Sequence, residues 1–302
     1  MNKDLLVPLL LDDWLETKTT LHLFTQIVGK IRLKLNPKMN HWWHAPLYVS
    51  ARGLTTRAIP FEKGLFEMEF DFIEHKLKTR TSSGDTRECP LVGNSVSGFF
   101  HSVRNGLHEM GIDVKMITHP FDSSKVKSDI KFPEDNVHKV YDKKSAEKFW
   151  RILTVIEPIF REFRGRFTGK CSPIHFFWHS FDLAVTRFSG RPAKVAENAD
   201  PVTKQAYSHE VISAGFWPGD DNIKEPAFYA YVAPEPPGLG KEPLSPQSAW
   251  WQKQNGSHMA LFKYEDFRKA GNPKAELLDF LQSSYEAGAK LANWPMKDLE
   301  AV

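Results

Sequence analysis

The segment FEMEFDFIEHKLKTR, residues 66–80, alternates large apolar side chains with acidic ones. Successive side chains of a β-strand point to opposite faces of the sheet, so this alternation predicts a strand with one buried face. The stretch SSGD at 82–85 follows and is typical of a turn, which makes an antiparallel hairpin the expected structure. The apolar positions are Phe66, Met68, Phe70 and Phe72, and the acidic positions are Glu67, Glu69 and Asp71.

Helical patterns flank this hairpin. Apolar residues recur at helical spacing up to Leu35, and a capping box of Asp13 and Glu16 is expected to begin this helix. Helical spacing recurs over 96–110. Asp142 is expected to cap a long helix that ends near residue 165, and Asn272 to cap the last helix. Further strands are expected at 113–119, 173–188, 208–217, 227–233 and 258–264. The fold class predicted is α+β, a mostly antiparallel sheet packed by long helices, in a single domain over residues 1–302.

Two stretches of the chain resemble each other. HWWHAPLYVSARG at 41–53 and HFFWHSFDLAVTRFSGR at 175–191 each begin with His and aromatic residues and continue through an apolar strand to Arg and Gly. We therefore expect two related helix–strands–helix halves, residues 14–118 and 143–292, with chance similarity of two aromatic strands as the alternative. The positions expected to superpose are His44 on His179 and Arg52 on Arg187, each pair being eight residues apart and so on one strand face.

Composition excludes several classes of protein. The chain has 302 residues, 41% of them hydrophobic, and a net charge of only +3, with Lys and Arg scattered among acids. A nucleic-acid binder would show a basic stripe, and a membrane span needs about 18 consecutive apolar residues, so we expect neither partner. Cys89 and Cys171 lie far apart and predict no disulfide framework, which indicates a reducing, cytoplasmic location. The oligomeric state is left open.

Histidines near the aromatic strands are the first candidates for chemistry. Histidine is the usual acid or base near neutral pH, so His179 and His209, with Glu210 beside the latter, are the predicted catalytic residues. His44 and His175 are predicted to line the same pocket. Half-buried histidines that simply pack on aromatic rings are the alternative for each of them. A transition-metal site is a minority alternative, because the spacing of these histidines is not diagnostic of one, and no cofactor is identified.

Arginines and tryptophans are the second set. The planar guanidinium groups of Arg52 and Arg187 could clamp a carboxylate or phosphate, while Trp178 and Trp217 would contact a flat or apolar part of the ligand. Asp182 is included in this ligand-binding set. The alternative is that each arginine is structural, capping a strand end or pairing with an acidic side chain. The acids considered for that pairing are Asp71, Glu74 and Glu210.

Long stretches of the chain resemble the bacterial domain-of-unknown-function family 5996. The resemblance implies a soluble bacterial protein and supplies no activity, cofactor or site residue. The stretches that carry it are LHLFTQIVGKIRL (21–33), NHWWHAPLYVSARGLTT (40–56), FDFIEHKL (70–77), GKCSPIHFFWHSFDLAVTRFSGR (169–191), YSHEVISAGFWPG (207–219) and AFYAYVAPEP (227–236).

Residue chemistry alone therefore leads to two functional hypotheses and a weaker third. The first is an enzyme that acts on a small anionic metabolite in a pocket of His, Arg and aromatic side chains. The second is a non-catalytic small-molecule binding protein that uses the same pocket. The third is a scaffold in which the aromatic strands are core and no site exists.

Overall fold

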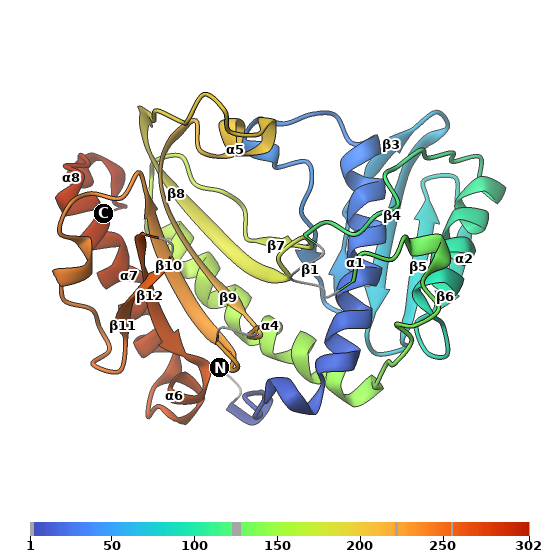
Figure 1. The fold of residues 1–302 in the computed structure, drawn as a ribbon, viewed down its shortest axis with the longest axis horizontal. Coiled ribbons are helices and arrows are strands. Elements are labelled where there is room, and N and C mark those ends of the chain that lie inside the picture. Colours follow the sequence, from blue (N-terminus) through green and yellow to red (C-terminus); the bar gives the residue numbers. More distant parts are fainter. Residues whose placement is uncertain (1–2, 123–127, 221–222, 255, 302) are drawn as a thin grey trace.

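A computed structural model of the chain describes residues 3–122, 128–220, 223–254 and 256–301. Over these residues the chain forms two six-stranded antiparallel sheets flanked by helices, so the predicted α+β class is confirmed (Figure 1). The first sheet consists of β1 (Tyr48–Val49), β2 (Gly53–Thr55), β3 (Ile59–Phe61), β4 (Gly64–Asp71), β5 (Lys76–Thr81) and β6 (Thr86–Pro90). The second consists of β7 (His175–Phe177), β8 (Asp182–Pro192), β9 (His209–Trp217), β10 (Ala227–Ala233), β11 (Trp250–Gln254) and β12 (Ser257–Lys263).

Long helices supply the hydrophobic layer of each sheet. Phe99 stacks between Phe24 and Phe70, which shows how two helices and the apolar face of β4 share one core. In the second half, two long helices pack against β8, β9 and β10. The helices are α1 (Leu15–Leu35), α2 (Val96–Glu109), α4 (Lys143–Gly165) and α7 (Pro273–Leu291), with the short α5 (Pro201–Ala206), α6 (Tyr264–Lys269) and α8 (Met296–Leu299).

The two sheets meet at their edges. The backbones of Leu47, just before β1, and Phe176 of β7 exchange two hydrogen bonds of 2.9 and 2.8 Å. Two indole N–H groups form further hydrogen bonds near this contact: Trp150 donates to the carbonyl of Ser50, and Trp178 donates to the carbonyl of Ala45. The line of contact between the halves is therefore built by the aromatic segments that the sequence singled out.

Two predicted strands are each divided by a turn that contains neither Gly nor Pro. Residues 66–80 form β4 and β5 with a turn at 72–75, where His75 has a φ of 56°. Residues 173–188 form β7 and β8 with a turn at 178–181, where Phe181 has a φ of 59°. Consequently His175 and His179 do not lie on one strand. The stretch 113–119 is irregular and pairs with no described strand, so the strand predicted there is wrong.

Helix caps agree with the predictions at two positions and differ at one. The side chains of Asp142 and Asn272 accept backbone N–H groups at the starts of α4 and α7, as expected. Gly111, with a φ of 76°, follows the end of α2 in the left-handed conformation. The capping box at Asp13 is wrong, because α1 begins after Trp14, which makes no side-chain cap bond.

The duplication is not confirmed. Each half runs from a helix through an antiparallel sheet to a helix, but one sheet is ordered β1-β2-β4-β5-β6 with β3 to the side and the other β11-β12-β10-β9-β8-β7. The residues expected to superpose also differ locally, since Arg52 lies in the turn before β2 whereas Arg187 lies within β8. The two related halves stay a prediction.

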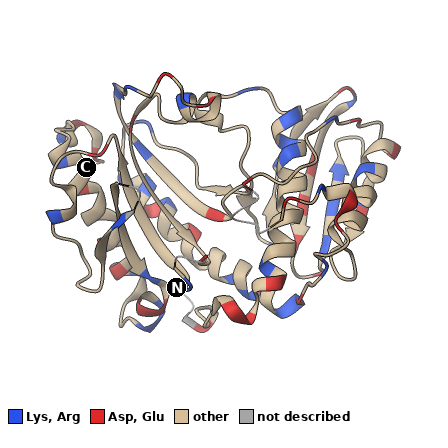
Figure 2. Cartoon of the chain, viewed as in Figure 1, with Lys and Arg blue, Asp and Glu red and all other residues tan. Residues whose placement is uncertain are grey.

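Two observations concern the distribution of charge and the apolar character of the helices. Figure 2 shows Lys and Arg mixed with Asp and Glu over both halves of the chain. Among the described residues, no helix has the length and apolar character needed to cross a bilayer.

Candidate functional site

A cavity of about 590 Å³ lies over the face of the second sheet that α4 and α7 leave uncovered. Its floor comes from β8, β9 and β10, and its walls come from α1, residues 41–45, α5 and the segment that follows β9. The volume falls within the range typical of small-molecule sites. Aromatic side chains dominate the lining: Trp42, Trp43, Phe121, Phe177, Trp178, Phe188, Tyr207, Trp217, Tyr229 and Tyr231.

Strand register determines which side chains form the floor. Thr186, Ser213 and Tyr231 are in register across β8, β9 and β10, and all three line the cavity. The hydroxyl groups of Thr186 and Ser213 are 2.9 Å apart, and those of Tyr231 and Tyr207 are 3.0 Å apart. Ser213 and Tyr231 also hydrogen bond to each other, so the floor is a continuous row of hydrogen-bonded hydroxyl groups.

Asp182 is the carboxylate of this floor. It is buried at the start of β8, where it accepts hydrogen bonds from the hydroxyl groups of Ser180 and Tyr229. Burial, and then the charge of Asp182, raise the pKa of the Tyr229 phenol well above its usual value, so that Tyr229 acts as a donor. The cavity floor therefore contains one acidic side chain that accepts hydrogen bonds from neutral hydroxyl groups.

Gly215 of β9 makes the Asp182–Tyr229 contact possible. It lies in register between Ala184 and Tyr229, and the ring of Tyr229 extends across it. A Cβ atom built on Gly215 would be 2.3 Å from both Cζ and the hydroxyl oxygen of Tyr229. Any other residue here would displace the ring from Asp182.

Three histidines line the walls. His22 of α1 is buried, and burial followed by the nearby Lys18 charge lowers its pKa to about 3. The pKa of His41 is lowered by burial and by Lys170, whose ammonium donates to His41 Nε2 at 2.6 Å. His41 Nδ1 therefore carries the proton and donates to the carbonyl of Gln205 at 3.0 Å. His179 lies between the rings of Phe121 and Phe177 at the rim.

The tryptophans of the walls differ in how their indole N–H groups are used. Trp178 packs against α1 where Gly29 has no side chain, and it donates to the carbonyl of Ala45 at 2.9 Å. The indole N–H groups of Trp42 and Trp217 are buried and have no hydrogen-bond partner within the described part of the chain. His41 and Trp42 also have φ values of 52° and 61°, so the wall contains two consecutive residues in the left-handed region.

Arg187 lies on the opposite face of β8. It is 1% exposed, its guanidinium carbon is 3.5 Å from the centre of the Phe163 ring, and Nη2 donates to the Phe163 carbonyl. Phe167 and Tyr285 complete an aromatic enclosure under α4 and α7. Residues 182, 184 and 186 face the cavity, so the odd-numbered Arg187 faces the helices on the other side of the strand. Arg187 therefore shares no surface with the residues that line the cavity.

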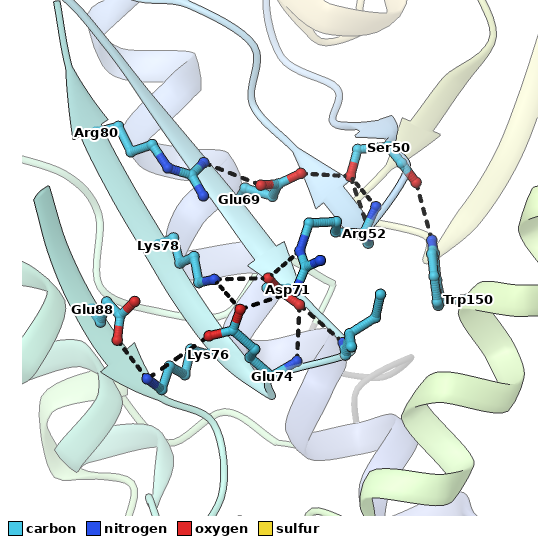
Figure 3. Close-up of polar contacts among 12 residues, drawn as sticks. Ser50, Arg52, Glu69, Asp71, Glu74, Lys76, Lys78, Arg80, Glu88 and Trp150 are labelled. Atoms are coloured by element: carbon cyan, nitrogen blue, oxygen red, sulfur yellow. Dashed lines mark hydrogen bonds and ion pairs between the residues drawn. The ribbon is translucent and has the colours of Figure 1, made fainter.

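Arg52 pairs with acidic side chains of the first half of the chain (Figure 3). This is the structural alternative that the sequence analysis considered for Arg52. Its Nε donates to the buried Asp71 at 2.6 Å and its Nη2 to Glu74 at 3.0 Å, while Lys78 lies 3.0 Å from Asp71. Burial by itself would raise the pKa of Asp71. The hydrogen bonds from Arg52, Lys78 and the backbone N–H groups of Glu74 and Ile73 outweigh it and hold that pKa well below its ordinary value.

The remaining predicted residues lie around the cavity without lining it. His44 is buried behind Trp42, with 5.2 Å between their ring centres, and His175 is buried among the rings of Trp43, Tyr48 and Phe177. His209 stacks edge-on against His41 and accepts or donates at Ser208, 3.1 Å away. Glu210 accepts from Arg191 at 2.7 Å. Of the predicted set, the cavity brings together Trp178, His179, Asp182 and Trp217.

The sequence reasoning missed the main floor residues. Tyr229, Tyr231 and Ser213 belong to strands that were predicted, but nothing in a single sequence says which face of those strands the helices cover. Gly215 carried a usable signal, because a glycine inside a strand often marks a close approach by another group. His22 lies in the helix that the sequence predicts up to Leu35, and no feature of the sequence singled it out.

The lining does not contain a recognisable metal centre. Among the described residues, no three His, Cys, Asp or Glu side chains lie close enough to hold a metal ion.

Comparison with protein families gives one match: the sequence model of the Family of unknown function (DUF5996) matches residues 6–301. The chain belongs to this family. No curated protein and no solved structure is significantly similar to the chain.

Proposed function

We propose that the protein binds a small molecule with a flat or apolar body in the cavity over the second sheet. The observation that carries this proposal is the combination of aromatic walls with a floor of hydroxyl groups and one buried carboxylate, Asp182. Binding sites for small molecules have this composition, mostly apolar with a few convergent polar groups. Left-handed backbone at His41 and Trp42 supports a role for the wall, since such strain persists where surrounding structure holds it for a purpose.

The charges around the cavity do not favour an anion. Arg52 and Arg187, the two groups expected to clamp one, lie outside the lining and have partners of their own. The formally charged Lys, Arg, Asp and Glu side chains among the described lining residues are Lys18, Asp182 and Asp220, and the Lys18 ammonium donates to the Gly219 carbonyl at 2.8 Å. A neutral or cationic ligand fits this set better than a phosphate or carboxylate.

A second candidate function is acid–base catalysis at the same place. It is favoured by one observation, that Asp182 and Tyr229 form a hydrogen-bonded pair on the cavity floor. In this role Asp182 would accept a proton from the bound molecule, and Tyr229 would orient the carboxylate. Asp182→Asn separates the two functions, because catalysis would be lost while a binding protein would keep part of its affinity.

The binding proposal is tested by a thermal-shift screen of a diverse metabolite library. Ala184 lies on the floor, so Ala184→Phe would occupy the cavity. Compounds that raise the melting temperature of the wild type are expected to leave the variant unchanged. Compounds that stabilise both proteins equally would place the binding site elsewhere, and a library without any stabilising compound would count against the proposal.

A further inference from the structure

We propose that the ligand of this cavity is an uncharged aromatic compound with few hydrogen-bonding groups, held by the ring faces of the lining. This inference rests on the proposed binding function and specifies the chemistry of the ligand. It follows from three features of the lining: polar side chains that bond to other parts of the chain, a surface of aromatic rings, and ammonium groups of the chain that lie over some of those rings.

The hydroxyl groups of the lining use nearly all of their protons within the chain. Each hydroxyl group has one proton to donate. The row of four hydroxyl groups on the floor contains three hydrogen bonds, and Ser180, Thr203 and Tyr229 each donate to a carboxylate. Six of the seven hydroxyl protons among the described lining residues are therefore used within the chain. A sugar or a nucleobase presents several acceptors, and this lining has at most one hydroxyl proton left for them.

The other polar groups of the lining are also engaged. The carboxylates of Asp182 and Asp220 both accept hydrogen bonds from the chain, and both ring nitrogens of His41 have partners. The indole Nε1 atoms of Trp42 and Trp217 are buried, so they are not part of the surface that a ligand contacts. A polar ligand would lose its hydrogen bonds to water on entering and would find few replacements, which makes its burial costly.

Partly exposed aromatic rings form much of the surface that remains. Trp43, Phe177, Tyr207, Trp217 and Tyr231 are each half-buried members of the lining. The hydroxyl bonds of the two tyrosines hold their rings in place, so the polar row shapes the aromatic surface instead of contacting the ligand. Aromatic pairs that pack offset or edge to face gain stability beyond the burial of their area. A flat aromatic ligand therefore uses this surface better than an aliphatic one.

Ammonium groups of the chain argue against a cationic ligand, which aromatic faces would otherwise attract. Lys38 Nζ lies 5.8 Å from the centre of the Trp42 ring, and Lys170 Nζ lies 5.4 and 5.3 Å from the centres of Trp43 and Phe188. A cationic ligand against these rings would lie near like charges. An anion is disfavoured by the buried carboxylate of the floor, so an uncharged ligand fits the lining best.

The experiment is a fluorescence titration of the full chain with N-phenyl-1-naphthylamine, an uncharged dye that brightens in apolar surroundings. Naphthalene, 1-naphthoate, 1-naphthylmethylammonium, adenine and D-glucose then compete with the dye. We expect naphthalene to displace the dye. Its anionic and cationic relatives keep the same ring system but bring a charge that the cavity does not pair, so each should bind about 10-fold more weakly or worse. Adenine, which is flat but rich in hydrogen-bonding groups, and D-glucose should compete more weakly than naphthalene.

Substitutions of tryptophan show whether the rings of the lining hold the dye. Trp217→Leu removes one ring and should weaken dye binding by about 10-fold. Trp251→Leu is the matched control, because Trp251 is also half-buried but lies on β11 outside the lining, so the affinity should not change. Thermal melts verify that each variant folds, and Trp43→Leu provides a second ring deletion if Trp217→Leu does not.

Several outcomes would overturn the inference. Displacement by adenine or D-glucose but not by naphthalene, or equal binding of a charged relative, would refute the ligand class and leave the binding function standing. A dye that binds Ala184→Phe as tightly as the wild type would place the binding elsewhere and count against both. Failure of every probe would refute the ligand class, and a blank metabolite screen beside it would refute the binding function as well.

Discussion

Arg187→Lys tests whether this buried arginine is part of the core or of a ligand site. The change keeps the positive charge but removes the planar guanidinium that lies between Phe163, Phe167 and Tyr285. Burial lowers the pKa of Arg187 to about 10, which shows that its charge is held at a cost. A lysine ammonium is more strongly hydrated than a guanidinium and would fit this enclosure worse.

The size of the effect follows from the contacts. The hydrogen bond from Nη2 to the Phe163 carbonyl is donated by a charged group, a type that contributes about 1.5–3 kcal/mol, and a desolvated cation–π contact contributes about 2 kcal/mol. Lysine would recover part of each, so we expect the free energy of unfolding to fall by about 2–4 kcal/mol. For a chain of this length the melting temperature should fall by roughly 3–6 °C.

The assay is urea and thermal unfolding of the purified proteins with no ligand added. Arg166→Lys is the control, because Arg166 is an exposed residue whose ion pair with Glu162 contributes little. An unchanged stability of Arg187→Lys, combined with phosphate or carboxylate stabilising only the wild type, would refute the structural assignment. It would show instead that Arg187 binds an anion.

Three further changes test other parts of the structure. Gly215→Ala places a methyl group 2.3 Å from the Tyr229 ring, so it should lower the unfolding free energy by about 1–3 kcal/mol and weaken the binding of any ligand in the cavity. Gly165→Ala is the control, because Gly165 has open space around it and the change should cost no measurable stability. Asp71→Asn should cost roughly 2–4 kcal/mol at pH 7; because the folded pKa of Asp71 is lowered, this difference from wild type should shrink as pH falls below about 4, and a constant difference would contradict the ion-pair explanation. Burial lowers the pKa of His175 to about 3, so only the unfolded chain binds this proton between about pH 6.5 and 3 and stability falls as pH decreases. His175→Phe should reduce the loss of unfolding free energy between pH 7 and 5 by about 2 kcal/mol. An equal pH dependence of stability in the wild type and this variant would exclude a buried neutral His175.

Strand positions could be predicted from the sequence because the alternation of apolar residues survives in the structure. Phe66, Met68 and Phe70 are all buried, as the period of two required. The turn after β4 could not be found from Gly or Pro. It depends instead on Asp71, whose carboxylate accepts the N–H groups of Ile73 and Glu74 and so closes the turn locally.

The second hidden turn had a larger effect on the site. With residues 178–181 folded as a turn, Asp182 becomes the first residue of β8 and is placed beside Tyr229. The sequence contained Asp182 and Arg187 at a spacing of five, which puts them on opposite faces of a strand, but it did not tell which face the helices would cover. Only the packing of α4 and α7 decides that Arg187 is core and Asp182 faces the cavity.

The contrast between the two faces of the second sheet is the strongest argument that the cavity has a use. On the helix face, Leu183, Val185 and Phe216 are apolar and fully packed. On the other face the strands present Asp182, Ser213 and Tyr229, buried groups that each need hydrogen-bond partners and would cost less if they were Leu or Val. Gly215 adds to this cost, since a glycine in a strand interior sacrifices both packing and entropy. A sheet that served only as a core would gain stability by losing these residues, so their presence favours a surface shaped to hold a ligand.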